Sequence, residues 1–236
     1  MSYMGDTEMV TWPDRPDWPD AGRLEEEAYR IVRSRIDLAR LPRISRDVTE
    51  RIIYASADFS YASDLICAEE SLTVAVAALA AGAPVIADVP MVAAGISGWP
   101  VICKAGEPLT RRLARTTGIA MAAAAVRLAY GDAGPGAVWV VGCEPAAIDE
   151  ILARGTEPAF VIGLPAGFVG AAEAKKALRC SGIPALTNVS CNGGPAAAVA
   201  ACLALLRLAQ ATTAGGPSGW GEGERVAVAP ADERSR

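Results

Sequence analysis

The sequence of 236 residues contains no histidine, and aromatic residues make up only 6% of it. Without histidine, the chain lacks the one side chain whose ordinary pKa suits proton exchange near pH 7. Zinc sites that mix cysteine with histidine are excluded for the same reason. Because large aromatic side chains are scarce, the core has to be filled mainly by alanine, valine, leucine and isoleucine.

The sequence also lacks an excess of basic residues and any long apolar run. Its net charge is −5, so a nucleic-acid-binding surface, which needs a basic face, is not predicted. Glycine, proline or charged residues interrupt the alanine-rich runs before they reach the roughly 20 apolar residues of a membrane span. The opening segment is acidic and proline-rich, which is not the pattern of a targeting peptide. We therefore expect a cytoplasmic protein without nucleic-acid or membrane partners.

No two of the six cysteines form a CxxC pair. They are Cys67, Cys103, Cys143, Cys180, Cys191 and Cys202. Their spacing does not predict a metal site. Without a signal peptide, their even number is only weak evidence for disulfides. We expect reduced, mostly buried thiols, and neither a metal ion nor another cofactor.

Composition divides the chain into three parts. Residues 1–20 carry two Trp-Pro-Asp triplets and are predicted to form a flexible acidic arm, because proline disfavours helix and the aspartates repel one another. Residues 21–211 have the length and pattern of one α/β domain. Residues 212–236 are rich in glycine, proline and charge, and are predicted to form a disordered tail.

Between these ends, apolar strands alternate with helices. Helices are predicted at residues 24–35, 47–54, 69–81, 109–130, 146–154, 171–180 and 196–209, with Ser45 or Asp47 capping the second. Strands are predicted at PVIADV, AVWVVG, AFVIGLP and IPALTNV. This alternation predicts an α/β fold with a mostly parallel sheet and helices on both faces. In such folds the functional site lies beyond the carboxyl ends of the strands.

Each predicted strand ends in a turn of small residues that leads into a helix. The four turns read ADVPMVAAGIS, VGCEPAA, GLPAGFVG and NVSCNGGPAAA. The free N–H groups at a helix N-terminus favour an anion or a polarised carbonyl group. One such turn only reverses the chain direction, but several on one edge favour a pocket. None matches GxGxxG or GxxxxGK[ST], so nucleotide binding is not predicted.

Three segments resemble one known family, the precorrin-8X methylmutases. GLPAGFVGAAEAKKAL, residues 163–178, is similar to the family signature GxPVGFVGAAESKxAL. ERIIYASADFSYASDL, residues 50–65, is similar to ERxIHxTAD(F/Y)DYAxxL, and APVIADVPMVAAGI, residues 83–96, contains the pattern DVxMVxxGI. The resemblance runs in order from about residue 25 to residue 209.

This resemblance implies an α/β homodimer whose active site lies near the subunit interface. It also implies a small-molecule substrate and a reaction. A methyl group moves between adjacent ring carbons of a corrin precursor on the way to cobalamin, and a histidine exchanges a proton with the macrocycle.

The chain departs from the family at three places. Tyr54 stands where the family has its histidine, and a tyrosine ordinarily titrates near pH 10, so it acts mainly as a hydrogen-bond donor. The family's GITRSA reads GIAMAA at residues 118–123, and its GRKGGS reads SCNGGP at residues 190–195. Both changes replace basic residues, which are the usual partners of carboxylates. We expect a pocket that is more apolar and less cationic than the family pattern implies.

The candidate catalytic residues are Tyr54, Ser56 and Asp58, which occupy alternate positions in RIIYASADFSYASDL. The candidate substrate-binding residues come from the strand-end turns and from the changed segment 118–123. They are Asp88, Met91, Met121, Gly167, Phe168, Gly170, Cys191, Asn192 and Gly193.

Several of these residues have a purely structural alternative. Tyr54 could pack in the core with its hydroxyl group on a backbone partner. Asp58 could cap a helix that begins near Tyr61. Asp88 and Asn192 could each fix a turn.

Three functions are compatible with the sequence. The favoured hypothesis is an enzyme with the precorrin isomerase fold, repurposed for the intramolecular rearrangement of a less anionic specialised metabolite. The second is a genuine precorrin-8X methylmutase in which Tyr54 replaces the histidine. The third is a non-catalytic protein that binds a corrinoid or a partner. Fold alone does not decide among them.

Overall fold

A six-stranded sheet forms the centre of the described part of the chain, which comprises residues 21–213 of the computed structural model. Its strands are β1 (Leu65–Cys67), β2 (Val85–Ala87), β3 (Val101–Ile102), β4 (Val138–Val141), β5 (Phe160–Gly163) and β6 (Ala185–Asn188). They lie in the order β1-β6-β5-β4-β2-β3. Only β1 pairs antiparallel, with β6, and the other neighbours are parallel. The predicted α/β class with a mostly parallel sheet is confirmed.

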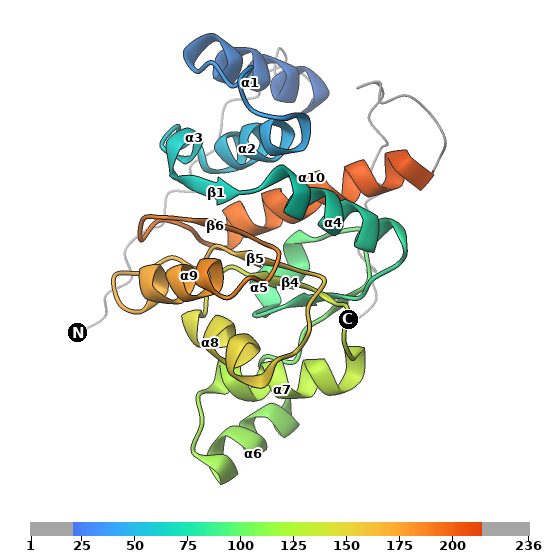
Figure 1. Cartoon of the computed structure of the whole chain (residues 1–236), viewed down its shortest axis with the longest axis vertical. Helices are drawn as coiled ribbons and strands as arrows, with labels where there is room; N and C mark the ends of the chain where they lie inside the picture. The colour runs from blue at the N-terminus through green and yellow to red at the C-terminus, as the bar shows by residue number, and fades with distance from the viewer. Residues whose placement is uncertain (1–20, 214–236) are drawn as a thin grey trace, which may run out of the picture.

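Helices cover both faces of this sheet. They are α1 (Ala21–Arg35), α2 (Arg43–Ser56), α3 (Tyr61–Asp64), α4 (Glu69–Ala80), α5 (Pro90–Gly95), α6 (Pro108–Thr117), α7 (Met121–Ala133), α8 (Pro145–Arg154), α9 (Ala171–Cys180) and α10 (Pro195–Thr213). Figure 1 shows α2, α4 and α10 on one side of the sheet and α7 and α8 on the other. Helix α1 lies outside α2, and α6 lies outside α7.

Successive strand residues point into two separate cores. In β4, Val138 and Val140 belong to the cluster under α2, α4 and α10, whereas Trp139 and Val141 belong to the cluster under α7 and α8. Because both faces are buried, the strand reads as a continuous apolar run and not as an alternating one. This burial explains why AVWVVG was recognisable in the sequence.

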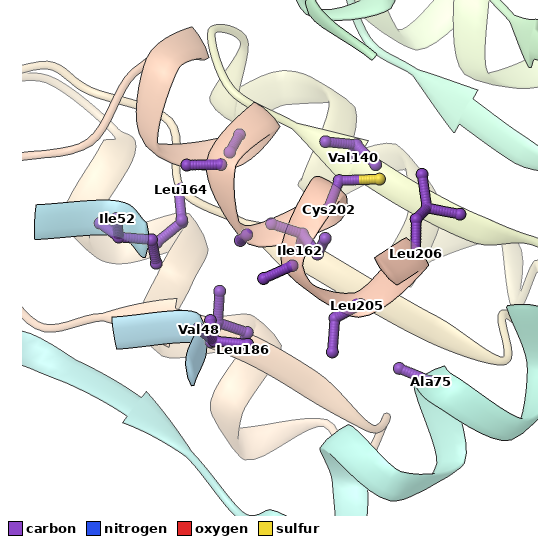
Figure 2. Packing of buried hydrophobic residues seen from close by; sticks show 14 of the residues in the cluster. Val48, Ile52, Ala75, Val140, Ile162, Leu164, Leu186, Cys202, Leu205 and Leu206 are labelled. Atoms are coloured by element: carbon purple, nitrogen blue, oxygen red, sulfur yellow. The ribbon is translucent and has the colours of Figure 1, made fainter. Parts of the chain in front are cut away.

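Helix α10 is the central helix of the larger core. Figure 2 shows its Cys202, Leu205 and Leu206 among Val140 and Ile162 of the sheet, and all five side chains are buried. By length and composition alone α10 could cross a membrane, but half of its most apolar stretch is buried inside the protein. Its apolar surface is therefore explained by packing against α2, α4 and the sheet.

The four predicted strands are confirmed as β2, β4, β5 and β6. The sequence pattern does not predict β1 or β3, because segments of three and two residues are too short to show a period. Both lie at edges of the sheet. The added β1 brings the chain after α3 against the end of β6, which matters for the site.

The predicted long helix at residues 109–130 is wrong, because the chain forms two helices there. Gly118 adopts a left-handed conformation, with φ at +68°, and terminates α6. Helix α7 then begins at Met121. Apolar periodicity continues across the break, so a pattern search alone joins the two helices.

Helix α2 begins at Arg43, earlier than predicted, and neither Ser45 nor Asp47 is its N-cap. A carboxylate from another helix satisfies its first N–H groups. Glu69 of α4 accepts hydrogen bonds from the N–H groups of Ile44 (2.8 Å) and Ser45 (2.9 Å). Such a tertiary cap has no local sequence signature.

The cysteines are free thiols, but the expectation that most are buried is wrong. Cys202 is buried in the core, Cys180 is exposed, and the other four are partly exposed. Cysteines in the strand-end turns lie near the surface because the turns themselves do. The predicted arm at residues 1–20 lies outside the described residues, and so does the predicted tail except for residues 212–213, which continue α10.

Candidate functional site

Two glycine-containing loops meet at the carboxyl edge of the sheet. Loop 164–170 follows β5, and loop 189–194 follows β6. The N–H group of Gly167 donates to the carbonyl oxygen of Cys191 (3.0 Å), and the N–H group of Gly194 donates to that of Leu164 (2.7 Å). A methyl group at Gly193 would come within 2.3 Å of the Leu164 oxygen, so only glycine fits this crossing. The expected convergence of strand-end turns is present.

A buried lysine holds the second loop from behind. Lys175 of α9 is 0% exposed, and its Nζ donates to Asn188 Oδ1 (2.8 Å) and to the carbonyl oxygens of Ser190 (2.6 Å) and Asn192 (2.8 Å). The three N–H bonds of an ammonium group thus match three acceptors. Burial lowers the pKa of Lys175 to about 8, so the ammonium form still predominates at neutral pH.

A carboxylate holds the same loop from the other direction. Asp64, at the end of α3, accepts hydrogen bonds from the N–H groups of Val189 (3.0 Å) and Ser190 (2.8 Å), from the Ser190 hydroxyl (2.6 Å) and from Asn188 Nδ2 (2.7 Å). Burial alone would raise the pKa of Asp64, but these bonds outweigh it and hold the pKa below its ordinary value. Loop 189–194 is therefore fixed by two opposite charges.

Sequence reasoning missed Lys175, Asp64 and Asn188 as contributors to the site. One signal was available, because Lys175 shares the apolar face of its helix with Ala171, Ala174 and Leu178, which are all buried. A lysine at such a position has to find buried partners.

Tyr54 lies in the last turn of α2 and is 39% exposed, so the alternative of a buried core tyrosine is wrong. Its ring stacks on that of Tyr29 from α1, with centroids 5.2 Å apart. The guanidinium group of Arg33 lies 5.7 Å from the Tyr29 centroid. Arg33 in turn donates to both carboxylate oxygens of the buried Glu50 of α2, from Nε (3.0 Å) and Nη2 (2.7 Å). The stack of Arg33, Tyr29 and Tyr54 fixes the orientation of the Tyr54 ring.

The other two candidate catalytic residues make local bonds. The Ser56 hydroxyl donates to the carbonyl oxygen of Ile52 (2.7 Å) and accepts from the N–H group of Asp58 (3.2 Å). Asp58 Oδ1 accepts from the N–H group of Ser60 (2.8 Å), one residue before α3, and so stabilises a turn and does not cap the helix itself. Its Oδ2 lies 3.5 Å from Asn192 Nδ2. The structure thus brings Asp58 and Asn192 together.

Asp88 follows β2 and is 6% exposed. Its Oδ2 accepts hydrogen bonds from the N–H groups of Cys143 (2.7 Å) and Glu144 (2.9 Å), which tie β2 to the turn before α8. Oδ1 is buried and has no partner among the described residues. Burial raises the pKa of Asp88, against the lowering effect of the backbone hydrogen bonds. Fixing a turn, the structural alternative for this residue, is what its contacts show.

Three of the candidate binding residues are exposed apolar side chains, and they are together called the rim. Phe168 is 96% exposed in loop 164–170, and Met91 and Met121 are 68% and 44% exposed at the starts of α5 and α7. Gly170 precedes α9 with φ at +79° and lies close to Pro145 of α8. The rim is apolar and suits an apolar part of a ligand better than a densely charged one.

Acidic and thiol side chains do not cluster at the rim and the loops of the described chain. Within residues 21–213, no three Cys, Asp or Glu side chains come close enough together to hold a metal ion. No hydrogen bond within this range joins the Tyr54 hydroxyl group to Asp58 or Asp88. The arrangement can position a ligand and supply hydroxyl, amide and carboxyl groups to it.

Comparison with known proteins gives a consistent result. A sequence model of the precorrin-8X methylmutase family matches residues 23–208. The chain is 34% identical over 200 residues to a precorrin-8X methylmutase from Sinorhizobium. This alignment covers 80% of this chain and 95% of the relative. It is 35% identical over 193 residues to a cobalt-precorrin-8 methylmutase from Methanothermobacter thermautotrophicus, covering 79% of this chain and 93% of the relative.

A solved structure agrees with these matches. The precorrin-8X methylmutase of Thermus thermophilus superposes with a TM-score of 0.73 at 30% identity, over 81% of this chain and 97% of that one. The family model matches most of the domain, and relatives above 30% identity match over nearly their whole length. These matches assign the chain to one family. The chain belongs to the precorrin-8X methylmutase family, whose members are isomerases of cobalamin biosynthesis.

Proposed function

We propose that this protein is an intramolecular isomerase that moves a methyl group between neighbouring ring carbons of a precorrin-8X-type tetrapyrrole. The observation that carries the proposal is the placement of Tyr54. Its exposed ring is held by Tyr29 and lies near the end of α2, in the segment that resembles the family's histidine segment. Relatives with the methylmutase activity in their names match over most of their own length.

In this proposal the Tyr54 hydroxyl group replaces the histidine as hydrogen-bond donor and acid. It donates to the macrocycle while the methyl–carbon bond breaks at one ring carbon and forms at the next, and it keeps or regains its proton at the end. No external oxidant or reductant is needed, because the product is an isomer of the substrate. Holding the macrocycle in a reactive conformation on the apolar rim supplies much of the rate enhancement.

The Ser56 and Asp58 side chains have positioning roles in this scheme. Ser56 binds both the end of α2 and the N–H group of Asp58, so it fixes the direction in which the chain leaves the helix. Asp58 contacts Asn192 and connects that segment to loop 189–194. Asp88 shapes the neighbouring turn through Cys143 and Glu144.

A second candidate function is the rearrangement of a less anionic molecule. The feature that favours it is the composition of the site, where Met121, Cys191 and Asn192 stand at positions that carry basic residues in the pattern that the sequence resembles. Phe168 and Met91 add exposed apolar surface nearby. A substrate with fewer carboxylates would fit such a surface without leaving charges unpaired.

The exposed side chains of the site also bear on the assembly that we propose, a homodimer in the cytoplasm. Phe168 and Val169, 96% and 90% exposed, are proposed to be covered by a second copy of the chain in a homodimer with the site near the interface. Sedimentation velocity of the wild type and of Phe168→Ser tests this. A dimer that the substitution weakens supports the proposal, and a wild-type monomer at micromolar concentration refutes it.

The decisive experiment incubates the purified protein with precorrin-8X and follows the visible absorption spectrum. We expect conversion by the wild type, a loss of turnover of roughly a hundredfold or more in Tyr54→Phe, and retained turnover in Tyr54→His. Tyr130→Phe, on α7, is the matched control and should not change turnover. Full activity of Tyr54→Phe would remove Tyr54 from the mechanism. Absence of both binding and conversion would favour the less anionic substrate, and binding without conversion would favour a non-catalytic role.

A further inference from the structure

The contacts of Lys175 determine which way the peptide groups of loop 189–194 face. Two of its three acceptors are main-chain carbonyl oxygens, those of Ser190 (2.6 Å) and Asn192 (2.8 Å). All peptide bonds of the described chain are trans. In a trans peptide unit the N–H group points opposite to the C=O group. The N–H groups of Cys191 and Gly193, which belong to these two units, therefore both point away from the buried ammonium group.

These two N–H groups are the available donors of the loop. The neighbouring N–H groups of Val189 and Ser190 donate to Asp64, and that of Asn192 donates to the Ser190 hydroxyl group (3.1 Å). Within residues 21–213, the N–H groups of Cys191 and Gly193 have no hydrogen-bond partner. Both residues are only partly buried, so a ligand can approach them.

The ammonium group also makes these donors stronger. A carbonyl oxygen that accepts from a charged donor polarises its whole peptide unit, and hydrogen bonds in such chains reinforce one another. The Asn192 carbonyl accepts a second bond, from Asn188 Nδ2 (2.9 Å). The two N–H groups are held in place by this network, so binding a ligand costs little reorganisation.

We propose that the N–H groups of Cys191 and Gly193 form a subsite for one carboxylate of the ligand, with Lys175 as the positioning residue behind it. The subsite lies in the segment where the resembling family pattern carries basic side chains, which this chain lacks. Positive charge is supplied here through two peptide groups instead of a side chain at the surface. The identity of the carboxylate rests on the proposed function, whereas the existence of the subsite does not. The negative charge of Asp58 opposes the binding of a carboxylate at this subsite, because the Asp58 carboxylate contacts the Asn192 side chain.

The test is a titration of the ¹⁵N-labelled wild-type protein with sodium acetate, followed by amide chemical shifts. Sodium chloride at equal ionic strength is the control. Saturable downfield shifts are expected for the amide protons of Cys191 and Gly193, and none for those of Val189 and Ser190. No saturable shift, or the same shift in chloride, would overturn the proposal. Because acetate binding needs no turnover, failure of the subsite is distinguishable from failure of the methylmutase activity.

Two variants with opposite expected effects sharpen the test. Lys175→Met should weaken acetate binding roughly tenfold, since charge-assisted hydrogen bonds are about twice as strong as neutral ones. Asp58→Asn should strengthen it, because a nearby negative charge is removed. If Lys175→Met does not fold, the wild-type titration and Asp58→Asn still decide. Equal affinity in the wild type and in both folded variants would contradict the role given to Lys175.

Discussion

Replacing Lys175 by methionine should destabilise the fold strongly. The side chain is fully buried, and methionine fills a similar volume without any donor. The substitution leaves Asn188 Oδ1 and the carbonyl oxygens of Ser190 and Asn192 without their shared partner. It also leaves the carboxylate of Asp64 without the nearby positive charge that balances it.

The magnitude follows from the number of broken contacts. Removing one partner of a buried, hydrogen-bonded charge costs about 3–5 kcal/mol. These values of about 3–5 kcal/mol are measured on substituted proteins, so they already include the favourable free energy of burying the replacing side chain. A domain of this size has a total free energy of unfolding of about 5–15 kcal/mol, so the loss is a large fraction. It corresponds to a Tm lower by roughly 6–20 °C.

The neighbouring residue of the same type provides the control. Lys176 is exposed on the same helix, so Lys176→Met changes the same chemistry at a solvated position and should cost less than about 0.5 kcal/mol. Equilibrium unfolding in guanidinium chloride and calorimetry at pH 7 give both values. If the two variants unfold at the same denaturant concentration, Lys175 does not hold loop 189–194, and the reasoning on the site is refuted.

Three further predictions concern the same network. Because burial lowers the pKa of Lys175 to about 8, this residue binds more protons in the unfolded chain than in the folded one between pH 8 and 10. The stability of the wild type relative to Lys175→Met should therefore rise with pH in this window, by at most about 3 kcal/mol, and a flat difference in urea unfolding would contradict the lowered pKa. Asp64, whose pKa is held low, stabilises the fold above its ordinary pKa near 4, so Asp64→Asn should remove part of the stability lost on acidification, as acid titration by circular dichroism would show. Gly193→Ala should cost about 1–3 kcal/mol, because its methyl group would overlap a main-chain oxygen, and Gly194→Ala, with free space, should cost less in the same unfolding assay.

Much of the fold was predictable because strands that are buried on both faces consist of continuous apolar residues. The four central strands are continuous apolar runs, and the helices between them carry the expected periodicity. The break at Gly118 and the two edge strands were not predictable in this way. A single glycine in an apolar pattern is compatible with a continuing helix, and strands of two or three residues show no period.

The sequence by itself determined the fold class, the family resemblance and the place of Tyr54 in the segment that carries this resemblance, because these depend on residue order and local pattern. Only the tertiary structure decided that Tyr54 is exposed against Tyr29, and that Lys175 and Asp64 fix loop 189–194. Asp64 and Ser190 lie 126 positions apart in the chain. Hydrogen bonds between such distant residues depend on how the helices and strands pack, and no local pattern encodes them.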